Sequence, residues 1–238
     1  MFGRLAEAFF RRYPQLKAAA FYGSRAAGLA EADSDYDALL VLPDGLAWRE
    51  RWEAAGEIGT QLGVSLEITA TSPRSVEFHY RLFPDFRFRL KEAVIFGEAK
   101  VLNGNPPPTS KEGCENVLIE AEGWLESISD SYTLSDKAEV YYRVLRSLLI
   151  VEEIVEDDYS LRRLMGTLRQ LLGEPLVRRL RHPGARIRRH EVERLAEVTQ
   201  RIFAEARAKV EGMPPNESDA YIRQCDLARS RAAHTVVA

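Results

Sequence analysis

The chain has 238 residues, of which 45% are hydrophobic and 29% are charged, a composition typical of soluble globular domains. Its formal net charge of −3 does not favour a general nucleic-acid binder, so nucleic acid is not the expected partner. The sequence contains neither a signal-peptide pattern nor a run approaching the roughly 18 apolar residues of a membrane span, so we expect a cytoplasmic protein with no membrane partner.

The first half of the chain alternates helical and strand patterns. Apolar spacing predicts helices over residues 1–13 and 45–62, and Pro73 is expected to open a third. Short apolar or alternating runs predict strands at Lys17–Tyr22, Asp37–Leu42, Val64–Ala70, Ala93–Phe96 and Lys100–Leu102. These elements predict an α/β or α+β domain built around a mixed sheet.

The linker between the two halves lies near residues 103–110. It contains the three prolines Pro106–Pro108, which can neither continue a helix nor occupy a central strand. We therefore place one domain at residues 1–104 and a second at residues 110–238.

The second half shows helical patterns without a clear strand. Its expected helices cover residues 112–129, 136–157, 160–172, 174–181, 189–212 and 216–232. The segment around 136–157 is apolar around much of its circumference, which predicts the central helix of an all-α bundle. Cys114 and Cys225 are too few for a disulfide framework or a zinc site and are expected to be free thiols.

The first candidate site feature is a turn at Gly23-Ser24, where an apolar strand ends and a short helix is expected to begin. Glycine lets a ligand approach the backbone closely, and free amides at a helix start favour anions. Gly23, Ser24 and, with a weaker claim, Arg25 are therefore candidates for binding phosphate groups. Ser24 could equally serve as an ordinary helix N-cap, which is compatible with phosphate binding.

Three acidic residues form the second feature. Asp35 and Asp37 are two positions apart at the start of a strand, so their side chains should lie on one face. Glu67 lies on the polar face of a later strand, and if the two strands are neighbours the three carboxylates meet. Such oxygen ligands suit Mg²⁺. Glu77 is an alternative third ligand, and Asp33 is interpreted as a surface residue.

These motifs resemble the DNA polymerase β-type nucleotidyltransferase superfamily. The resemblance rests on Gly23-Ser24-Arg25 with Gly28, then Ser34-Asp35-Tyr36-Asp37 and a later acid on a strand, and it covers about residues 15–102. It is closest to minimal nucleotidyltransferase domains and their aminoglycoside-modifying relatives. Many relatives carry Asp at the third acidic position, which here is Glu67.

The resemblance implies transfer of a nucleoside monophosphate from an NTP, with ATP expected, to a hydroxyl acceptor. Asp35, Asp37 and Glu67 would be the catalytic and metal-binding residues, with Mg²⁺ or Mn²⁺ as the cofactor. Glu67 would complete a second metal site or act as the general base. The helical domain would form the other wall of the cleft and select the acceptor, and it is also a candidate homodimer interface.

Three functions remain open at this stage: transfer to a small molecule, an antitoxin-type enzyme that adds AMP to a protein partner, and a non-catalytic nucleotide-binding module. The complete set of acids argues against the third. A helical domain fused in the same chain mildly favours the first.

Other charged features have ordinary structural interpretations beside functional ones. The run of arginines from Arg178 to Arg189 is expected to mark solvated helix ends, with a polyanion-binding patch as the alternative. Tyr141, Tyr142, Arg143 and Arg146 are assigned to bundle packing, or else to the cleft. Arg229 and His234 resemble the Arg-x4-His motif of HEPN ribonuclease domains, but they lie too near the C-terminus for a following helix, so an inert HEPN-like bundle is favoured.

Overall fold

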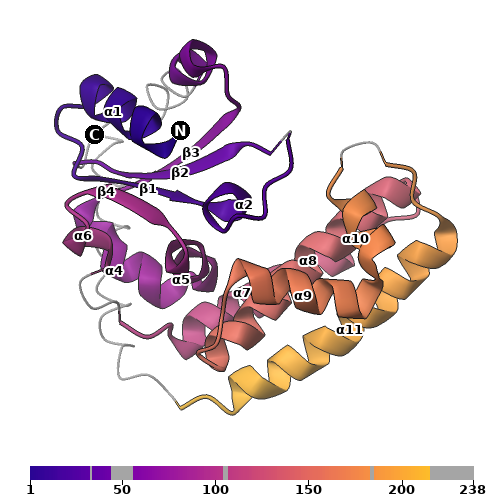
Figure 1. Cartoon of the computed structure of the whole chain (residues 1–238). Helices are drawn as coiled ribbons and strands as arrows, with labels where there is room; N and C mark the ends of the chain where they lie inside the picture. The colour runs from indigo at the N-terminus through magenta and orange to yellow at the C-terminus, as the bar shows by residue number, and fades with distance from the viewer. Residues whose placement is uncertain (33, 44–55, 104–106, 183–184, 215–238) are drawn as a thin grey trace, which may run out of the picture.

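The computed structural model describes residues 1–32, 34–43, 56–103, 107–182 and 185–214. It shows an α/β domain with a mixed sheet, followed by an all-helical domain, as the sequence predicts (Figure 1). The predicted domain limit at 104 lies outside the described residues, and the limits at 104 and 110 both stay a prediction.

The sheet of the first domain has four strands in the order β3-β2-β1-β4. Their bounds are β1 Ala18–Tyr22, β2 Tyr36–Val41, β3 Leu66–Thr71 and β4 Val94–Gly97. Strand β1 pairs in an antiparallel manner with β2 and β4, whereas β2 and β3 are parallel. The expected mixed sheet is thus confirmed, and β3 is an edge strand next to β2.

Helices cover both faces of this sheet. They are α1 Phe2–Arg12, α2 Gly23–Ala26, a helical segment at 56–62, α4 Pro73–Leu82, α5 Pro84–Lys91 and α6 Lys100–Asn103. Because strand side chains alternate, β2 sends Leu40 into a core with α1, and Leu39 and Val41 into a core with α4 and α5. Asp37 shares the alternation of Leu39 and Val41, so it faces the α4 and α5 side.

The structure departs from the sequence prediction in one place of this domain. The predicted strand at Lys100–Leu102 is wrong, because these residues begin the short helix α6, which buries Leu102 against the sheet. The helix expected to open at Pro73 is confirmed as α4, and Pro84 starts a further helix, α5, that was not predicted. Of the predicted helix 45–62, residues 45–55 lie outside the described residues.

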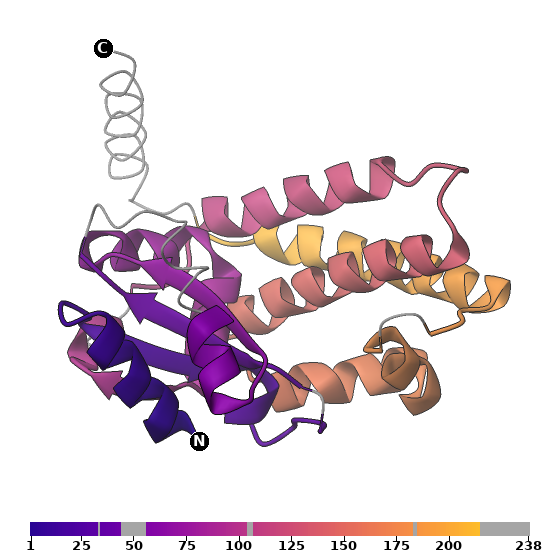
Figure 2. The same cartoon turned by 90° about the horizontal axis from the view of Figure 1, so that it is seen from above.

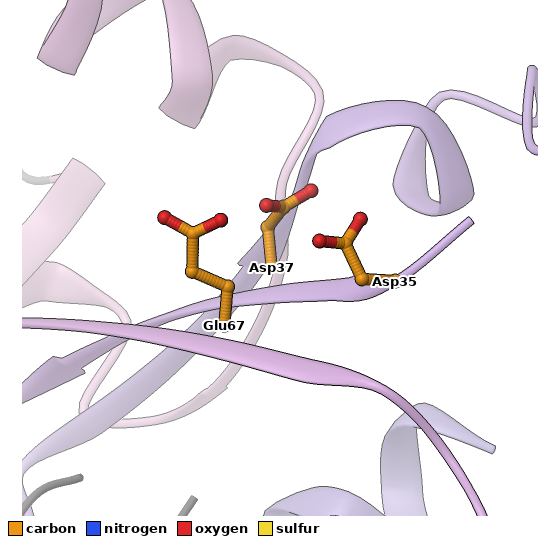
Figure 3. A group of neighbouring side chains, drawn as sticks. All are labelled: Asp35, Asp37 and Glu67. Atoms are coloured by element: carbon orange, nitrogen blue, oxygen red, sulfur yellow. The ribbon is translucent and has the colours of Figure 1, made fainter. Parts of the chain in front are cut away.

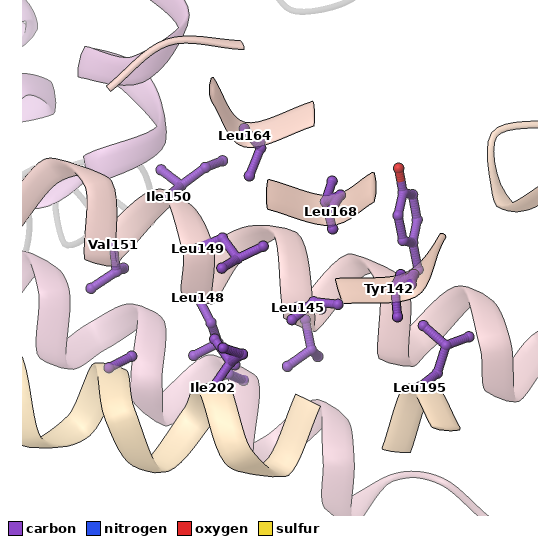
Figure 4. Close-up of a cluster of buried hydrophobic side chains, with 14 of the residues drawn as sticks. Tyr142, Leu145, Leu148, Leu149, Ile150, Val151, Leu164, Leu168, Leu195 and Ile202 are labelled. Atoms are coloured by element: carbon purple, nitrogen blue, oxygen red, sulfur yellow. The ribbon is translucent and has the colours of Figure 1, made fainter. Parts of the chain in front are cut away.

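The second domain consists of five described helices. They are α7 Lys111–Glu126, α8 Leu134–Val155, α9 Leu161–Leu172, α10 Glu174–Leu180 and α11 Arg189–Glu211. Buried aliphatic side chains of α8 meet those of α9 and α11 in one core (Figure 4). Helix α8 is therefore the central helix, as its apolar circumference predicts. The helix expected at 216–232, together with Cys225, Arg229 and His234, lies outside the described residues.

The two domains are joined on one side through α4 and α5, which contact α7 and α8 (Figures 1 and 2). Helix α5 contributes to both cores, because Leu90 packs under the sheet while Phe88 is buried in the helical domain. None of the described helices is long and apolar enough to cross a membrane. Cys114 of α7 is buried and is a free thiol.

Candidate active site

The three predicted acids lie on two neighbouring strands. In the parallel pair of β2 and β3, Asp37 is directly opposite Glu67. Asp35 lies two residues before Asp37, just ahead of β2, and its side chain is on the same side of the sheet (Figure 3). The structure therefore brings together the carboxylates that the sequence pattern selects.

The carboxylate group is compact enough to surround a cation. One oxygen from each of Asp35, Asp37 and Glu67 lies within 4.8 Å of the other two. Asp35 and Asp37 are partly buried, and Glu67 is exposed. Three hard oxygen donors at this separation fit a divalent cation such as Mg²⁺. Glu77, the alternative third acid, instead forms an ion pair with Arg81 on α4.

The negative charge of the site affects the pKa of Asp37. Burial, together with the negative charges of Asp35 and Glu67, raises the pKa of Asp37 to about 6. Arg89 and Arg146 oppose this increase in the pKa. Like charges held close favour the neutral acid unless a cation lies between them, so the donor set itself argues for a bound metal.

Gly23 lies directly against one of these acids. Its φ of +74° is in the left-handed region that favours glycine, and an added Cβ would overlap Oδ2 of Asp37. Gly23 and Ser24 both line the same cavity as the three acids. The turn is therefore placed beside the carboxylates.

Arg25 is occupied elsewhere. Its Nε donates a hydrogen bond of 2.8 Å to the carbonyl oxygen of Ser34, and its guanidinium lies over the Tyr36 ring at 4.3 Å. It does not line the cavity that contains the acids. In this structure Arg25 is hydrogen-bonded to the residue that precedes Asp35, and its contact with phosphate stays a prediction.

Sequence reasoning missed a polar network next to Asp37. Arg89 donates a hydrogen bond of 3.2 Å to the hydroxyl of Tyr22, which also lies 3.4 Å from Oγ1 of Thr69. Arg89 also forms an ion pair with Asp85, which lies one turn before it on α5. Thr69 could have been found, since it follows Glu67 on the polar face of β3. Nothing in the sequence links Arg89 to the site.

A cavity of about 1150 Å³ lies between the sheet and the helical domain. The helical wall carries arginines, and most of them are paired with carboxylates: Arg143 with Glu139, Arg169 with Glu174, Arg179 with Glu191 and Arg181 with Glu31. Arg146 makes no ion pair within the described part of the chain, and its side chain is exposed to the cavity. Tyr142 is buried beside it.

The residues that line the cavity on the helical side test two predictions, one about Arg143 and Arg146 and one about the basic run from Arg178 to Arg189. Arg143, Arg146 and Tyr142 line the cavity, which is the cleft interpretation. Tyr142 also belongs to the core of the bundle, and Tyr141 packs against that core. From the basic run, Arg179 and Arg181 also line the cavity, and Arg189 forms an ion pair with Glu193 on α11. Such neutralised arginines are less able to form the polyanion patch considered as an alternative.

Comparisons with known proteins agree with this geometry. Residues 3–97 match the protein family described as "Nucleotidyltransferase domain". No curated protein matches the chain in sequence. Among solved structures, spectinomycin adenyltransferase AAD(9) from Enterococcus faecialis, with ATP and spectinomycin, is 12% identical. That likeness covers 84% of this chain and 97% of the other, with a TM-score of 0.50.

Two toxin-antitoxin structures also resemble part of the chain. A Shewanella oneidensis HEPN toxin in complex with MNT antitoxin is 13% identical, over 52% of this chain and 92% of the other, with a TM-score of 0.32. A toxin-antitoxin structure with AMP-PNP is 15% identical, over 52% and 94%, with a TM-score of 0.34. The family match spans the sheet with its three acids, and the adenyltransferase fold extends over both domains. Residues 3–97 thus match a nucleotidyltransferase domain, and the chain shares its fold with the adenyltransferase.

Proposed function

We propose that the protein transfers AMP from ATP to a hydroxyl group of a small-molecule acceptor and releases pyrophosphate. The observation that supports this most directly is the group formed by Asp35, Asp37 and Glu67, whose oxygens lie within 4.8 Å of one another. The group opens into the same cavity as the Gly23-Ser24 turn. A triphosphate bound on that turn would have its charge next to the three acids.

Different residues of the site bind the metal, bind the phosphates and compensate their charge. A divalent cation, Mg²⁺ or Mn²⁺, held by Asp35, Asp37 and Glu67 would neutralise charge on the triphosphate. The backbone of Gly23 and the hydroxyl of Ser24 bind the β- and γ-phosphates. Arg146 faces Asp37 from the helical domain, so it adds positive charge on the open side of the triphosphate.

The transfer is a single displacement at phosphorus. The acceptor oxygen forms a bond to the α-phosphorus, and the bond from that phosphorus to the oxygen bridging to the β-phosphorus breaks. The electron pair leaves with pyrophosphate. The carboxylate oxygen of Glu67 that does not hold the cation accepts the proton of the acceptor hydroxyl, because Glu67 lies on the edge strand and is exposed to the cavity. Catalysis rests mainly on positioning and charge neutralisation.

The size of the cavity supports a small acceptor. Ligand pockets commonly measure about 300–1,000 Å³. The volume of about 1150 Å³ therefore leaves room for a compact second molecule beside a nucleotide. The adenyltransferase that shares the fold is named for spectinomycin, a small molecule. A protein acceptor, as in an antitoxin-type enzyme, is the second candidate, but the helical domain of this chain already occupies that side of the site.

The test is transfer of label from α-labelled ATP in the presence of Mg²⁺ or Mn²⁺ to a panel of small hydroxyl compounds, with spectinomycin among them. We expect a labelled product and pyrophosphate from the wild-type protein. The variants Asp35→Asn and Asp37→Asn should form neither, because each removes a charged ligand. Glu98→Gln is the matched control, since this acid pairs with Lys17 outside the cavity.

Two outcomes would contradict the proposal. Transfer that persists in both asparagine variants would exclude this site. Binding of ATP with no transfer to any small molecule or co-purifying protein would show a nucleotide-binding module that is not an enzyme.

A further inference from the structure

The segment that joins α2 to β2 is braced from within. Nε of Arg25 donates to the carbonyl oxygen of Ser34 at 2.8 Å, and the backbone amide of Glu31 donates to Oγ of Ser34 at 2.9 Å. Ser34 is followed directly by Asp35, one of the three clustered acids. A hydrogen bond thus ties Glu31 to Ser34, the residue next to Asp35.

The helical domain holds the same segment from outside. Oε1 of Glu31 lies 2.9 Å from Nη1 of Arg181, and Oε2 lies 3.1 Å from Nε2 of His182. These two residues directly follow α10. Two residues before Glu31, Leu29 packs against the core of the helical domain. Each oxygen of one carboxylate thus meets a different side chain of the other domain.

This contact lies apart from the connection through α4 and α5. Arg181, His182 and Leu29 line the cavity together with Asp35, so the segment forms part of the cavity wall. A cleft attached on one side only can change its width, whereas a second attachment fixes it. Here the second attachment passes through the residues that lead to a carboxylate of the acidic group.

We propose that Glu31 is a positioning residue, which uses its contacts with Arg181 and His182 to hold Asp35 in its place in the acidic group. The proposal rests on the proposed function, because it assigns Asp35 to the metal site. Partly exposed ion pairs usually add little to the stability of the fold. Glu31 should therefore act on metal binding and rate more than on the stability of the fold.

The test compares Glu31→Ala with Glu98→Ala, which removes an ion pair with Lys17 within the first domain. Binding of Mn²⁺ is followed by electron paramagnetic resonance without nucleotide, and kcat and KM for ATP are measured separately. For Glu31→Ala we expect Mn²⁺ affinity and kcat to fall by about three- to tenfold, with a smaller change in KM. Glu98→Ala should leave all three values unchanged.

A charge exchange separates positioning from a structural role. Glu31→Arg and Arg181→Glu should each weaken Mn²⁺ binding, and the double variant should recover most of the loss because the pair is restored with reversed sign. Unchanged Mn²⁺ affinity and kcat in Glu31→Ala would overturn the proposal, and so would a double variant no better than either single one.

The Asp37→Asn variant distinguishes the two proposals. If it loses Mn²⁺ binding while Glu31→Ala keeps wild-type affinity, the metal site stands and only the coupling through Glu31 fails. If Asp37→Asn itself binds Mn²⁺ like the wild type, the metal site fails first.

Discussion

Gly23 provides a test of how closely the turn and the acids are fitted together. In Gly23→Ala the new methyl group would overlap Oδ2 of Asp37, and the φ of +74° would strain the backbone. We expect nucleotidyl transfer to fall by at least about 100-fold, because the methyl group displaces a metal ligand. The loss of stability should stay near the roughly 1–2 kcal/mol of a left-handed alanine. Both are measured, by transfer of label and by denaturant unfolding.

Gly28→Ala is the control for this experiment. Gly28 has a similar φ of +69°, but an added Cβ would have no atom within 4 Å. It therefore carries the backbone strain without the collision. Equal losses of activity in the two variants would show that strain at the turn, and not displacement of Asp37, explains the effect.

Arg146 supports a prediction about the binding of ATP. It faces Asp37 across the cavity, and its guanidinium makes no ion pair within the described residues. We expect Arg146→Ala to raise the KM for ATP by about tenfold, because the triphosphate loses one compensating charge. Arg207→Ala is the control, since Arg207 pairs with Glu122 outside the cavity. An unchanged KM in Arg146→Ala would remove this residue from the nucleotide site.

Single residues also show how far the sequence can predict a site. Asp35, Asp37 and Glu67 were predictable as a group, because side chains alternate between the two faces of a strand, and this determines which of them share a face. Arg25 lies in the same motif, yet the sequence does not reveal that its guanidinium is bound to the carbonyl of Ser34. Arg146 lines the site from the other domain, and sequence patterns around a residue do not predict contacts between domains.

At the scale of elements, the periodicity of apolar residues was sufficient for the strands β1 to β4 and the helices α7 to α11. It failed at Lys100–Leu102, where three residues are too few to separate a strand from a helical turn. The sequence predicted that the three carboxylates meet if β2 and β3 are neighbours, but it did not predict that they are neighbours. Their pairing depends on hydrogen bonds between residues about thirty positions apart, which local patterns do not encode.

The end of α8 contains a buried acid that should make stability depend on pH. Burial raises the pKa of Glu153 from 4.5 to about 7, although a hydrogen bond from the Ser160 amide and the charge of Arg163 oppose the increase. The folded state therefore binds a proton that the unfolded state has already released at intermediate pH. The stability that comes from this proton is complete below pH 4.5 and is lost as the pH rises through about 7.

Glu153→Gln cannot lose this proton. We expect it to resemble the wild type at about pH 5 and to be more stable at about pH 8, by on the order of 2 kcal/mol. Denaturant unfolding at both pH values measures the difference. Glu139→Gln, on the exposed side of α8, should show no such pH dependence. A difference between wild type and Glu153→Gln that stays constant with pH would contradict the assignment.

For the whole molecule, the linker prolines and the change from mixed patterns to helices indicated two domains. How the domains face one another could not be predicted, because it depends on contacts between residues far apart in the sequence. The paired contacts of Glu31 with Arg181 and His182 are one such case. The burial of Phe88 from α5 in the core of the helical domain is another.

Phe88 makes the connection between the domains testable. Helix α5 places Leu90 in the core under the sheet and Phe88 in the helical core, so the two cores share one rigid element. We expect the wild-type chain to unfold in a single calorimetric transition. Removing a buried phenylalanine costs about 3–5 kcal/mol. In Phe88→Ala that loss falls on the contact between the domains, so the transition should separate into two. Phe21→Ala removes an equally large side chain from the sheet core alone, and it should lower the transition temperature without separating the domains.

Two transitions in the wild type, or one sharp transition in Phe88→Ala, would show that α5 does not couple the two cores.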